Sequence, residues 1–265
     1  MAEELRDIEP LRPLLDRKPF AILSDIDGTL APIVANPEDA HISPRARDAL
    51  LVLIELGAGV GFITGRALEK AREIVDIPGA YFAGNHGLNI AADGLAEAPE
   101  ELRPYVAWAQ QVIRDASGIK IPGVIVEDKG PVVAFHYRMA DEEEPARAAI
   151  ERAIGLSEAA RNFRVQQGRK VIELRPPIAI DKGTAVETLA MRLGAESVLT
   201  MGDDATDLDM FRGAGALRER GIPAASVAVW SYEVQPEVLE GTDYFVRGVE
   251  GVEWMLEEIV KALRP

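Results

Sequence analysis

The chain has 265 residues, 48% of them hydrophobic, so it can bury a sizeable core in one large domain or two smaller ones. Its 29 basic and 44 acidic residues give a net charge of −15, which disfavours a nucleic acid partner because phosphates would be repelled. The absence of cysteine excludes disulfides, thiolate nucleophiles and cysteine-ligated zinc, which leaves oxygen donors of the kind that magnesium prefers.

The sequence shows neither a membrane-spanning segment nor a signal peptide. No run of apolar residues is long enough to span a bilayer, and the N-terminal stretch is acidic where a signal peptide would be basic and then apolar. We therefore expect a cytoplasmic protein without a membrane partner.

The first predicted strand, residues 20–24, is a short apolar run that leads directly into Asp25-Ile26-Asp27-Gly28. It presents two carboxylates at the carboxyl end of a strand, where open α/β sheets bind ligands. Such a pair can bind a divalent metal, attack an electrophile and transfer a proton. It can equally be a simple turn, because Asp-Gly is a common hairpin signal between apolar runs. The pair alone leaves both interpretations open.

The following segments alternate between helical and strand patterns, as a parallel α/β sheet requires. Ser43 and Pro44 predict a helix start, because serine caps helices and proline fits their first position. The predicted elements are a helix over 44–56, a strand over 59–63, a helix over 67–75, a strand over 81–83 and a small hairpin over 88–95.

The pattern changes near residue 99, after which a helix-strand-strand unit occurs twice in succession. The predicted helices cover 100–116 and 142–154, and the predicted strands cover 124–129, 132–138, 164–167 and 170–175. Such a unit forms a four-stranded, mostly antiparallel sheet with two helices on one face. Pro176-Pro177 favours an extended linker that closes it. We predict an inserted domain of residues 100–177 within an α/β core of residues 1–99 and 178–265.

The α/β pattern resumes with helices over 183–193, 205–214 and 250–263 and strands over 197–201 and 226–229. Thr64, Lys182 and the aspartates at 203, 204 and 207 fall at strand ends or helix starts of the core, which a parallel sheet brings together. Each also has a structural interpretation, as a helix cap or a surface charge. Jointly they supply what phosphoryl transfer requires, namely a carboxylate nucleophile, an acid/base, metal ligands, and a hydroxyl and an ammonium for phosphate oxygens.

These segments resemble the four motifs of the haloacid dehalogenase superfamily. The motifs are Asp25-x-Asp27-Gly-Thr, Thr64, Lys182 and Gly-Asp203-Asp204-x-Thr-Asp207. The resemblance implies a Rossmann-like core in which Asp25 is the nucleophile that forms an aspartyl-phosphate. Asp27 would protonate the leaving oxygen and then activate water. Mg²⁺ would lie between Asp25, the backbone carbonyl of Asp27 and Asp203, and Asp207 would support the site, while Thr64 and Lys182 would offset the charge of the phosphate.

The position of the insertion narrows the subtype. Only 36 residues separate Asp27 from Thr64, whereas 117 separate Thr64 from Lys182. The insertion therefore lies in the second of these two intervals, between Thr64 and Lys182. The resemblance extends here to the C2-capped members of the superfamily, which carry their cap domain in this interval. The resemblance implies an α+β cap domain that closes over substrate, excludes water and supplies specificity.

Three segments of the insertion resemble the cap signatures of trehalose-6-phosphate phosphatases. They are Val126-Glu127-Asp128-Lys129, His136-Tyr137-Arg138 and residues 168–176. Strand alternation places Glu127 and Lys129 on one face, and Glu173 and Arg175 on one face of their own strand. From the pattern alone, these charges can serve a sugar or form surface ion pairs. The resemblance favours the sugar and implies that Glu127, Lys129 and Glu173 bind the distal glucose.

The remaining substrate-binding candidates are Gly65, Arg66, His86 and Arg138. Arg66 can face the phosphate or pair with a core acid, and His86 can face substrate or fix its loop by a hydrogen bond. The resemblance implies a magnesium-dependent phosphatase that acts on a small-molecule sugar phosphate, with trehalose 6-phosphate as the first expectation. We also expect the protein to be a monomer. Alternatives are sucrose 6-phosphate, mannosyl- or glucosyl-glycerate phosphates, or a non-catalytic sugar-phosphate sensor.

Overall fold

The computed structural model describes residues 2–34, 39–92, 95–97, 99–168, 170–232 and 234–264. The chain divides into two compact units, one formed by Met1–Glu97 with Ile180–Pro265 and one formed by Ala98–Ala179. The predicted fold class, a Rossmann-like α/β core with an α+β insertion, is confirmed. We keep 100–177 as the proposed limits of the inserted domain.

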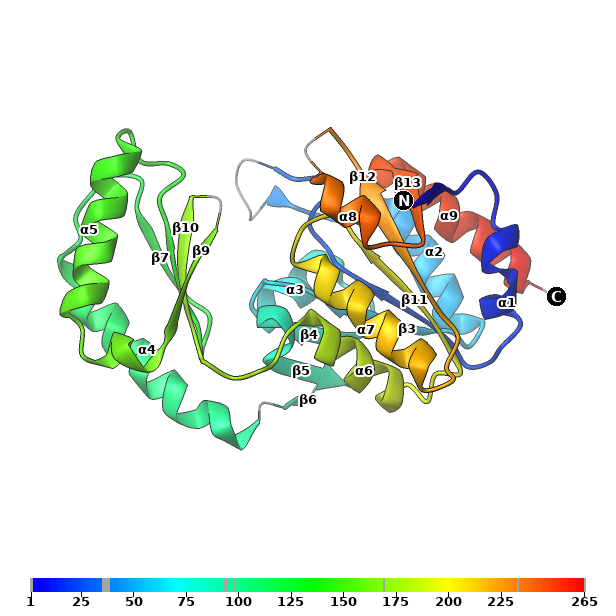
Figure 1. Cartoon of the computed structure of the whole chain (residues 1–265), viewed down its shortest axis with the longest axis horizontal. Helices are drawn as coiled ribbons and strands as arrows, with labels where there is room; N and C mark the ends of the chain where they lie inside the picture. The colour runs from blue at the N-terminus through cyan, green and yellow to red at the C-terminus, as the bar shows by residue number, and fades with distance from the viewer. Residues whose placement is uncertain are drawn as a thin grey trace. The chain divides into compact units, whose positions relative to one another are not determined.

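A mainly parallel sheet forms the centre of the first unit (Figure 1). Its strands are β1 (Glu3–Glu4), β2 (Phe20–Ser24), β3 (Gly59–Ile63), β4 (Tyr81–Gly84), β5 (Asn89–Ala92), β6 (Leu95–Glu97), β11 (Ser197–Gly202), β12 (Ala224–Trp230) and β13 (Tyr244–Arg247). Their order across the sheet is β1-β13-β12-β11-β2-β3-β4-β5-β6. In this order, all neighbouring strands from β1 across to β4 pair in parallel. Strands β5 and β6 pair antiparallel at the edge next to β4.

Helices cover both faces of this sheet, which explains why every residue of β2 and β11 is buried. One face packs against α1 (Arg12–Leu15), α2 (Pro44–Glu55), α3 (Leu68–Val75) and α9 (Gly248–Leu263). The other packs against α6 (Lys182–Arg192), α7 (Asp207–Glu219) and the short α8 (Pro236–Glu240). In Figure 1, α6 and α7 lie in front of the sheet and α2 and α9 behind it. No helix within the described ranges is long and apolar enough to cross a bilayer.

The register of the central strands determines what meets at their carboxyl ends. Ser24 of β2 pairs with Met201 of β11 on one side and with Phe62 of β3 on the other. The residues that follow these three positions along the chain therefore emerge at the same edge of the sheet. Asp25, Thr64 and Asp203 are among them, as the sequence predicts.

Several elements of the first unit differ from the sequence prediction, which did not include β1, α1 or α8. Helix α7 begins at Asp207 and not at residue 205, because the Asp207 carboxylate accepts the backbone N–H groups of Asp203 and Asp204 and so fixes a loop before the helix. Strand β13 was not predicted, because four residues show too little alternation, and its extended form depends on parallel pairing with β12 and β1. Asp93 and Gly94 of the predicted hairpin over 88–95 lie outside the described residues.

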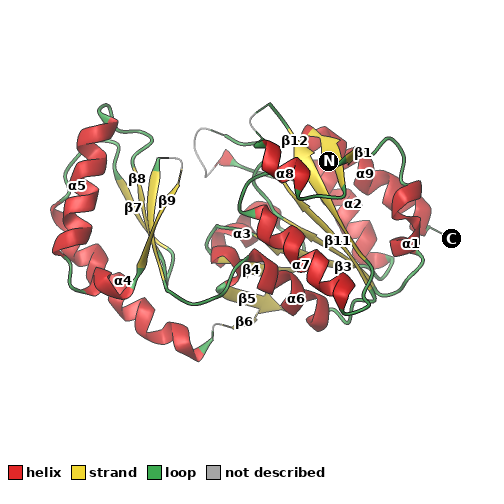
Figure 2. Ribbon diagram, in the orientation of Figure 1, coloured by secondary structure: helices red, strands yellow, loops and turns green. Residues whose placement is uncertain are grey.

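The second unit is a four-stranded sheet with helices on one face (Figure 2). Its elements are α4 (Arg103–Asp115), β7 (Ile125–Asp128), β8 (Val133–His136), α5 (Glu143–Leu156), β9 (Arg164–Gly168) and β10 (Val171–Arg175). The order is β7-β8-β10-β9, and each neighbouring pair is antiparallel. Val133, Phe135, Ile172 and Leu174 point to the helices and form the core of this unit with them. The Arg169 position of the predicted signature lies outside the described residues.

Candidate active site

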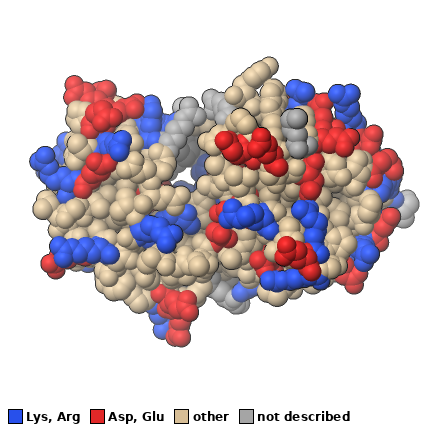
Figure 3. All heavy atoms as spheres, in the orientation of Figure 1, with Lys and Arg blue, Asp and Glu red and all other residues tan. Residues whose placement is uncertain are grey.

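Buried charges mark the candidate site. On the face drawn in Figure 3, basic and acidic side chains are interspersed over the surface, as expected of solvated groups. Among the described residues, the charged side chains that are buried are Asp25, Lys182, Asp203, Asp207 and Glu253. Glu253 of α9 has a surface partner in Arg45. The other four gather at the carboxyl ends of β2 and β11, and such clusters are characteristic of functional sites.

Lys182 connects two of these acids. Its Nζ atom donates to Asp25 Oδ1 at 2.9 Å and to Asp207 Oδ1 at 2.7 Å, and its side chain is 3% exposed. Lys182 opens α6, and the capping box between Asp181 and Thr184 fixes this helix start. Asp181 therefore caps α6, whereas Lys182 is not a surface charge.

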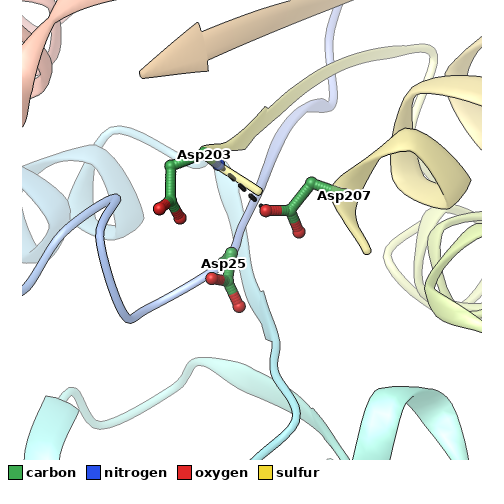
Figure 4. Close-up of side chains that lie close together, drawn as sticks. All are labelled: Asp25, Asp203 and Asp207. Carbon is green, nitrogen blue, oxygen red and sulfur yellow. Dashed lines mark hydrogen bonds between the residues drawn. The ribbon is translucent and has the colours of Figure 1, made fainter. Parts of the chain in front are cut away.

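Asp207 also organises the loop that carries Asp203. Its Oδ2 atom accepts the N–H groups of Asp203 at 2.9 Å and Asp204 at 3.0 Å, and Figure 4 shows the first of these bonds. Thr29 Oγ1 donates to Asp203 Oδ1 at 3.2 Å. Gly28 leaves room for this carboxylate, because a Cβ atom there would lie 2.0 Å from Asp203 Oδ2, and its φ of +80° also favours glycine. The DxDGT turn and the second aspartate loop thus fit each other closely.

Burial dominates the electrostatics of the cluster. It raises the pKa of Asp25 well above its usual range, against the opposing effect of Lys182. Burial, with the neighbouring Asp207 and Asp204, raises the pKa of Asp203 to about 8, and burial also raises the pKa of Asp207. Burial alone would lower the pKa of Lys182, but the carboxylates of Asp207 and Asp25 raise it above its ordinary value. One ammonium therefore serves three buried acids, so the three carboxylates, if all were ionised, would carry an excess of negative charge.

This excess, together with the donor atoms, fits a hard divalent cation. Asp25, Asp203 and Asp207 each offer one oxygen, and these oxygens lie within 4.8 Å of one another (Figure 4). Carboxylate oxygens are the ligands that Mg²⁺ prefers. Because Asp207 already accepts three hydrogen bonds from Lys182 and the loop, it suits a supporting role behind Asp25 and Asp203.

The raised pKa of Asp203 leads to a prediction about stability without metal. Between about pH 4 and pH 8 the folded state holds a proton on Asp203 that the unfolded state has lost, so this residue destabilises the fold progressively as pH rises. With a chelator present, Asp203→Asn should melt slightly higher than the parent at pH 5 and by a larger margin, roughly 5 °C or more, at pH 8.5. Thermal melting at both pH values, with the exposed Asp48→Asn as control, measures this. Equal melting temperatures at pH 8.5 would contradict it.

Asp27 has a different cation from Asp25. Arg66 Nε donates to Asp27 Oδ2, and Arg66 Nη2 donates to Asp27 Oδ1, both at 2.6 Å. The Arg66 side chain is 16% exposed and that of Asp27 is 36% exposed. Of the two alternatives left open for Arg66, the structure thus shows pairing with a core acid.

Thr64, Gly65 and Arg66 form a loop that is held by the Asn85-His86-Gly87 turn. The carbonyls of Thr64 and Arg66 accept the N–H groups of His86 and Asn85, both at 2.8 Å. The His86 ring lies against Gly65, since a Cβ atom there would be 2.7 Å from Nε2. Thr64 is 1% exposed and does not cap α3, whose N-cap is Ala67.

The second unit carries its own polar cluster on the sheet face that lies opposite its core. Lys129 Nζ lies 2.9 Å from Glu173 Oε1 and 3.8 Å from Glu127 Oε2. The register places Glu127 and Glu173 on either side of Ala134, and hence on one face. His136 Nε2 forms a 2.8 Å hydrogen bond with Glu127 Oε2. Arg138 lies in the turn after β8, with its side chain exposed.

Sequence reasoning did not select two of the residues that contact the candidates. Thr29 belongs to the DxDGT motif, and a hydroxyl directly after the glycine was a usable signal for contact with Asp203. His136 was part of the quoted signature, and its spacing of two from Ala134 puts it on the face of Glu127.

Comparison with known proteins adds independent information. Residues 23–235 match the family model described as trehalose-phosphatase. The chain is 33% identical over 249 residues to the probable trehalose-phosphate phosphatase D of Arabidopsis thaliana, covering 84% of this chain and 66% of that protein. It is also 33% identical over 253 residues to the trehalose-phosphate phosphatase of Mycobacterium bovis, covering 88% of this chain and 63% of that protein. The chain thus spans about two thirds or less of these relatives.

Solved structures agree on the fold. The C-terminal domain of the C. albicans trehalose-6-phosphate phosphatase superposes with a TM-score of 0.74 at 22% identity, covering 98% of both chains. A trehalose-6-phosphate phosphatase related protein gives the same TM-score at 21% identity, covering 91% of this chain and 97% of that one. At these identities the likeness supports the fold alone.

Proposed function

Since the chain belongs to the trehalose-phosphatase family, we propose that it is a magnesium-dependent phosphatase that hydrolyses trehalose 6-phosphate to trehalose and phosphate. The observation that carries this proposal is the buried cluster in which Lys182 connects Asp25 to Asp207, with Asp203 beside them. A protein that only binds sugar phosphates does not need a buried nucleophile, a second acid two residues later and a cation between the acids.

In the proposed first step, an oxygen of Asp25 attacks the phosphorus and the bond from phosphorus to the sugar oxygen breaks. Asp27 gives its proton to that oxygen, and trehalose leaves. Asp27 then takes a proton from a water molecule that attacks the aspartyl-phosphate. The bond between phosphorus and Asp25 breaks, which releases phosphate and restores the Asp25 carboxylate.

The negative charges of carboxylate and phosphate repel each other, so the site has to offset them. A bound Mg²⁺ would supply positive charge for this purpose. Its proposed ligands are Asp25, the backbone carbonyl of Asp27 and Asp203, with Asp207 in support. The ammonium of Lys182, the hydroxyl of Thr64 and the backbone of Gly65 are proposed to bind phosphate oxygens. Lys182 is well suited, because the site already holds it charged against Asp25.

We propose that the second unit recognises the sugar through Glu127, Lys129 and Glu173, with contributions from Arg138 and from His86 in the first unit. The Lys129 ammonium lies 2.9 Å from the Glu173 carboxylate and 3.8 Å from that of Glu127, so the three side chains offer donors and acceptors for neighbouring hydroxyls. The short distances between these charges also agree with ion pairing, so a substrate comparison is needed.

A comparison of two substrates tests the sugar assignment. Lys129→Met should lower kcat/KM for trehalose 6-phosphate roughly 10- to 100-fold, because bonds from a charged donor to the sugar are lost. It should leave hydrolysis of p-nitrophenyl phosphate unchanged, because that ester has no sugar. Lys120→Met, an exposed lysine of the same unit, serves as the matched control. Equal losses on both substrates, or no loss, would contradict the assignment.

The same assay identifies the preferred substrate. Trehalose 6-phosphate should be hydrolysed faster than sucrose 6-phosphate and than mannosyl- or glucosyl-glycerate phosphates. If it were no better than p-nitrophenyl phosphate, the assignment to trehalose 6-phosphate would fail, and binding without any turnover would favour a sensor.

A further inference from the structure

Arg66 lies beside Asp27, the proposed proton carrier. Its guanidinium donates to both oxygens of Asp27 at 2.6 Å, whereas Lys182 donates to Asp25. The two acids of the DxD turn therefore have different cations. A planar guanidinium fixes both the position and the plane of a carboxylate, which a single ammonium cannot do.

The backbone of Arg66 is itself fixed. Its N–H donates to Thr64 Oγ1 at 3.2 Å and its carbonyl accepts the Asn85 N–H at 2.8 Å. Asn85 and His86 have φ values of +51° and +58°, in the left-handed region that residues other than glycine rarely adopt. Backbone strain of this kind persists where the surrounding structure requires it and occurs often at functional sites. Here the left-handed conformation directs the N–H groups of Asn85 and His86 to the carbonyls of Arg66 and Thr64. These bonds hold the loop of residues 64–66, so the position of Arg66 is fixed.

We propose that Arg66 is a positioning residue that fixes the side chain of Asp27, so that its main contribution falls on hydrolysis of the aspartyl-phosphate. This inference rests on the proposed function. The two bonds from Arg66 fix both the position and the plane of the Asp27 carboxylate. The second step depends most on this orientation, because Asp27 there has to orient a free water molecule toward phosphorus. In the first step, the leaving oxygen is already held by its bond to phosphorus.

This role has a kinetic signature. Loss of Arg66 should slow the second step, so kcat should fall about 100-fold, as is typical when a catalytic group loses its orientation. The value of kcat/KM, which reports steps up to formation of the aspartyl-phosphate, should fall less than about 10-fold, so KM should fall as well. The aspartyl-phosphate should then accumulate during turnover.

The experiment compares Arg66→Ala and Arg66→Lys with the parent on trehalose 6-phosphate labelled in its phosphate. Steady-state constants are measured, and protein-bound label is counted after acid quenching. Both variants should accumulate labelled protein, because lysine keeps the charge but not the two bonds that fix the carboxylate. Added guanidinium should raise kcat of Arg66→Ala and lower its bound label. Arg47→Ala is the matched control, because Arg47 pairs with Asp76 on the surface.

Two results would overturn the inference. A higher KM with unchanged kcat and no bound label would make Arg66 a substrate ligand. An equal fall of kcat and kcat/KM, together with a lower melting temperature in both variants, would show that Arg66 has only a structural role. A parent protein without turnover would instead refute the proposed function, so the two failures are distinguishable.

Discussion

Asp25→Asn is expected to lower kcat for trehalose 6-phosphate by at least about 10⁴-fold while leaving the protein folded. An amide cannot attack phosphorus under these conditions, so no aspartyl-phosphate forms. Stability should not suffer, because burial raises the pKa of Asp25 and the neutral amide replaces a group that is costly to ionise there. Lys182 keeps its bond to Asp207 in the variant.

Steady-state turnover with Mg²⁺ and thermal melting measure the two parts of this prediction. The exposed Asp48→Asn, on α2, makes the same chemical change outside the site and should have full activity. If Asp25→Asn kept magnesium-dependent hydrolysis, the aspartyl-phosphate mechanism would have to be abandoned.

Lys182→Met is expected to cause the largest loss of stability, about 3–5 kcal/mol in the free energy of unfolding at neutral pH. The substitution leaves the carboxylates of Asp25 and Asp207 buried without the ammonium that pairs with both. The loss should be smaller at pH 5 than at pH 8, because these acids have raised pKa values and ionise less at low pH. Turnover should fall about 10²- to 10³-fold, as for removal of one donor from a developing anion.

Urea unfolding of the metal-free protein at both pH values measures this effect. Lys261→Met removes an exposed lysine that pairs with Glu258 and should change little. The double variant Lys182→Met/Asp207→Asn should recover part of the stability, because it removes a charge from each side of the pair. Unchanged stability of Lys182→Met at pH 8 would show that Lys182 does not balance the buried acids.

Much of the fold follows from local patterns in the sequence. The buried apolar run of β2, the Ser43-Pro44 start of α2 and the repeated helix-strand-strand order of the insertion each predict their element, because period and capping are properties of neighbouring residues. Strand β13 shows the limit of such patterns. Its four residues become a strand through pairing with β12 and β1, which are distant in the sequence.

The sequence by itself determined which residue types stand at the strand ends, and therefore that carboxylates, a hydroxyl and an ammonium meet at one edge of the core. Only the tertiary structure decided which cation serves which acid. Lys182 pairs with Asp25 and Asp207, Arg66 pairs with Asp27, and Lys129 lies between Glu127 and Glu173. The physical reason is that ion pairing depends on distances of a few ångströms between residues far apart in the chain, and register, loop geometry and burial set these distances.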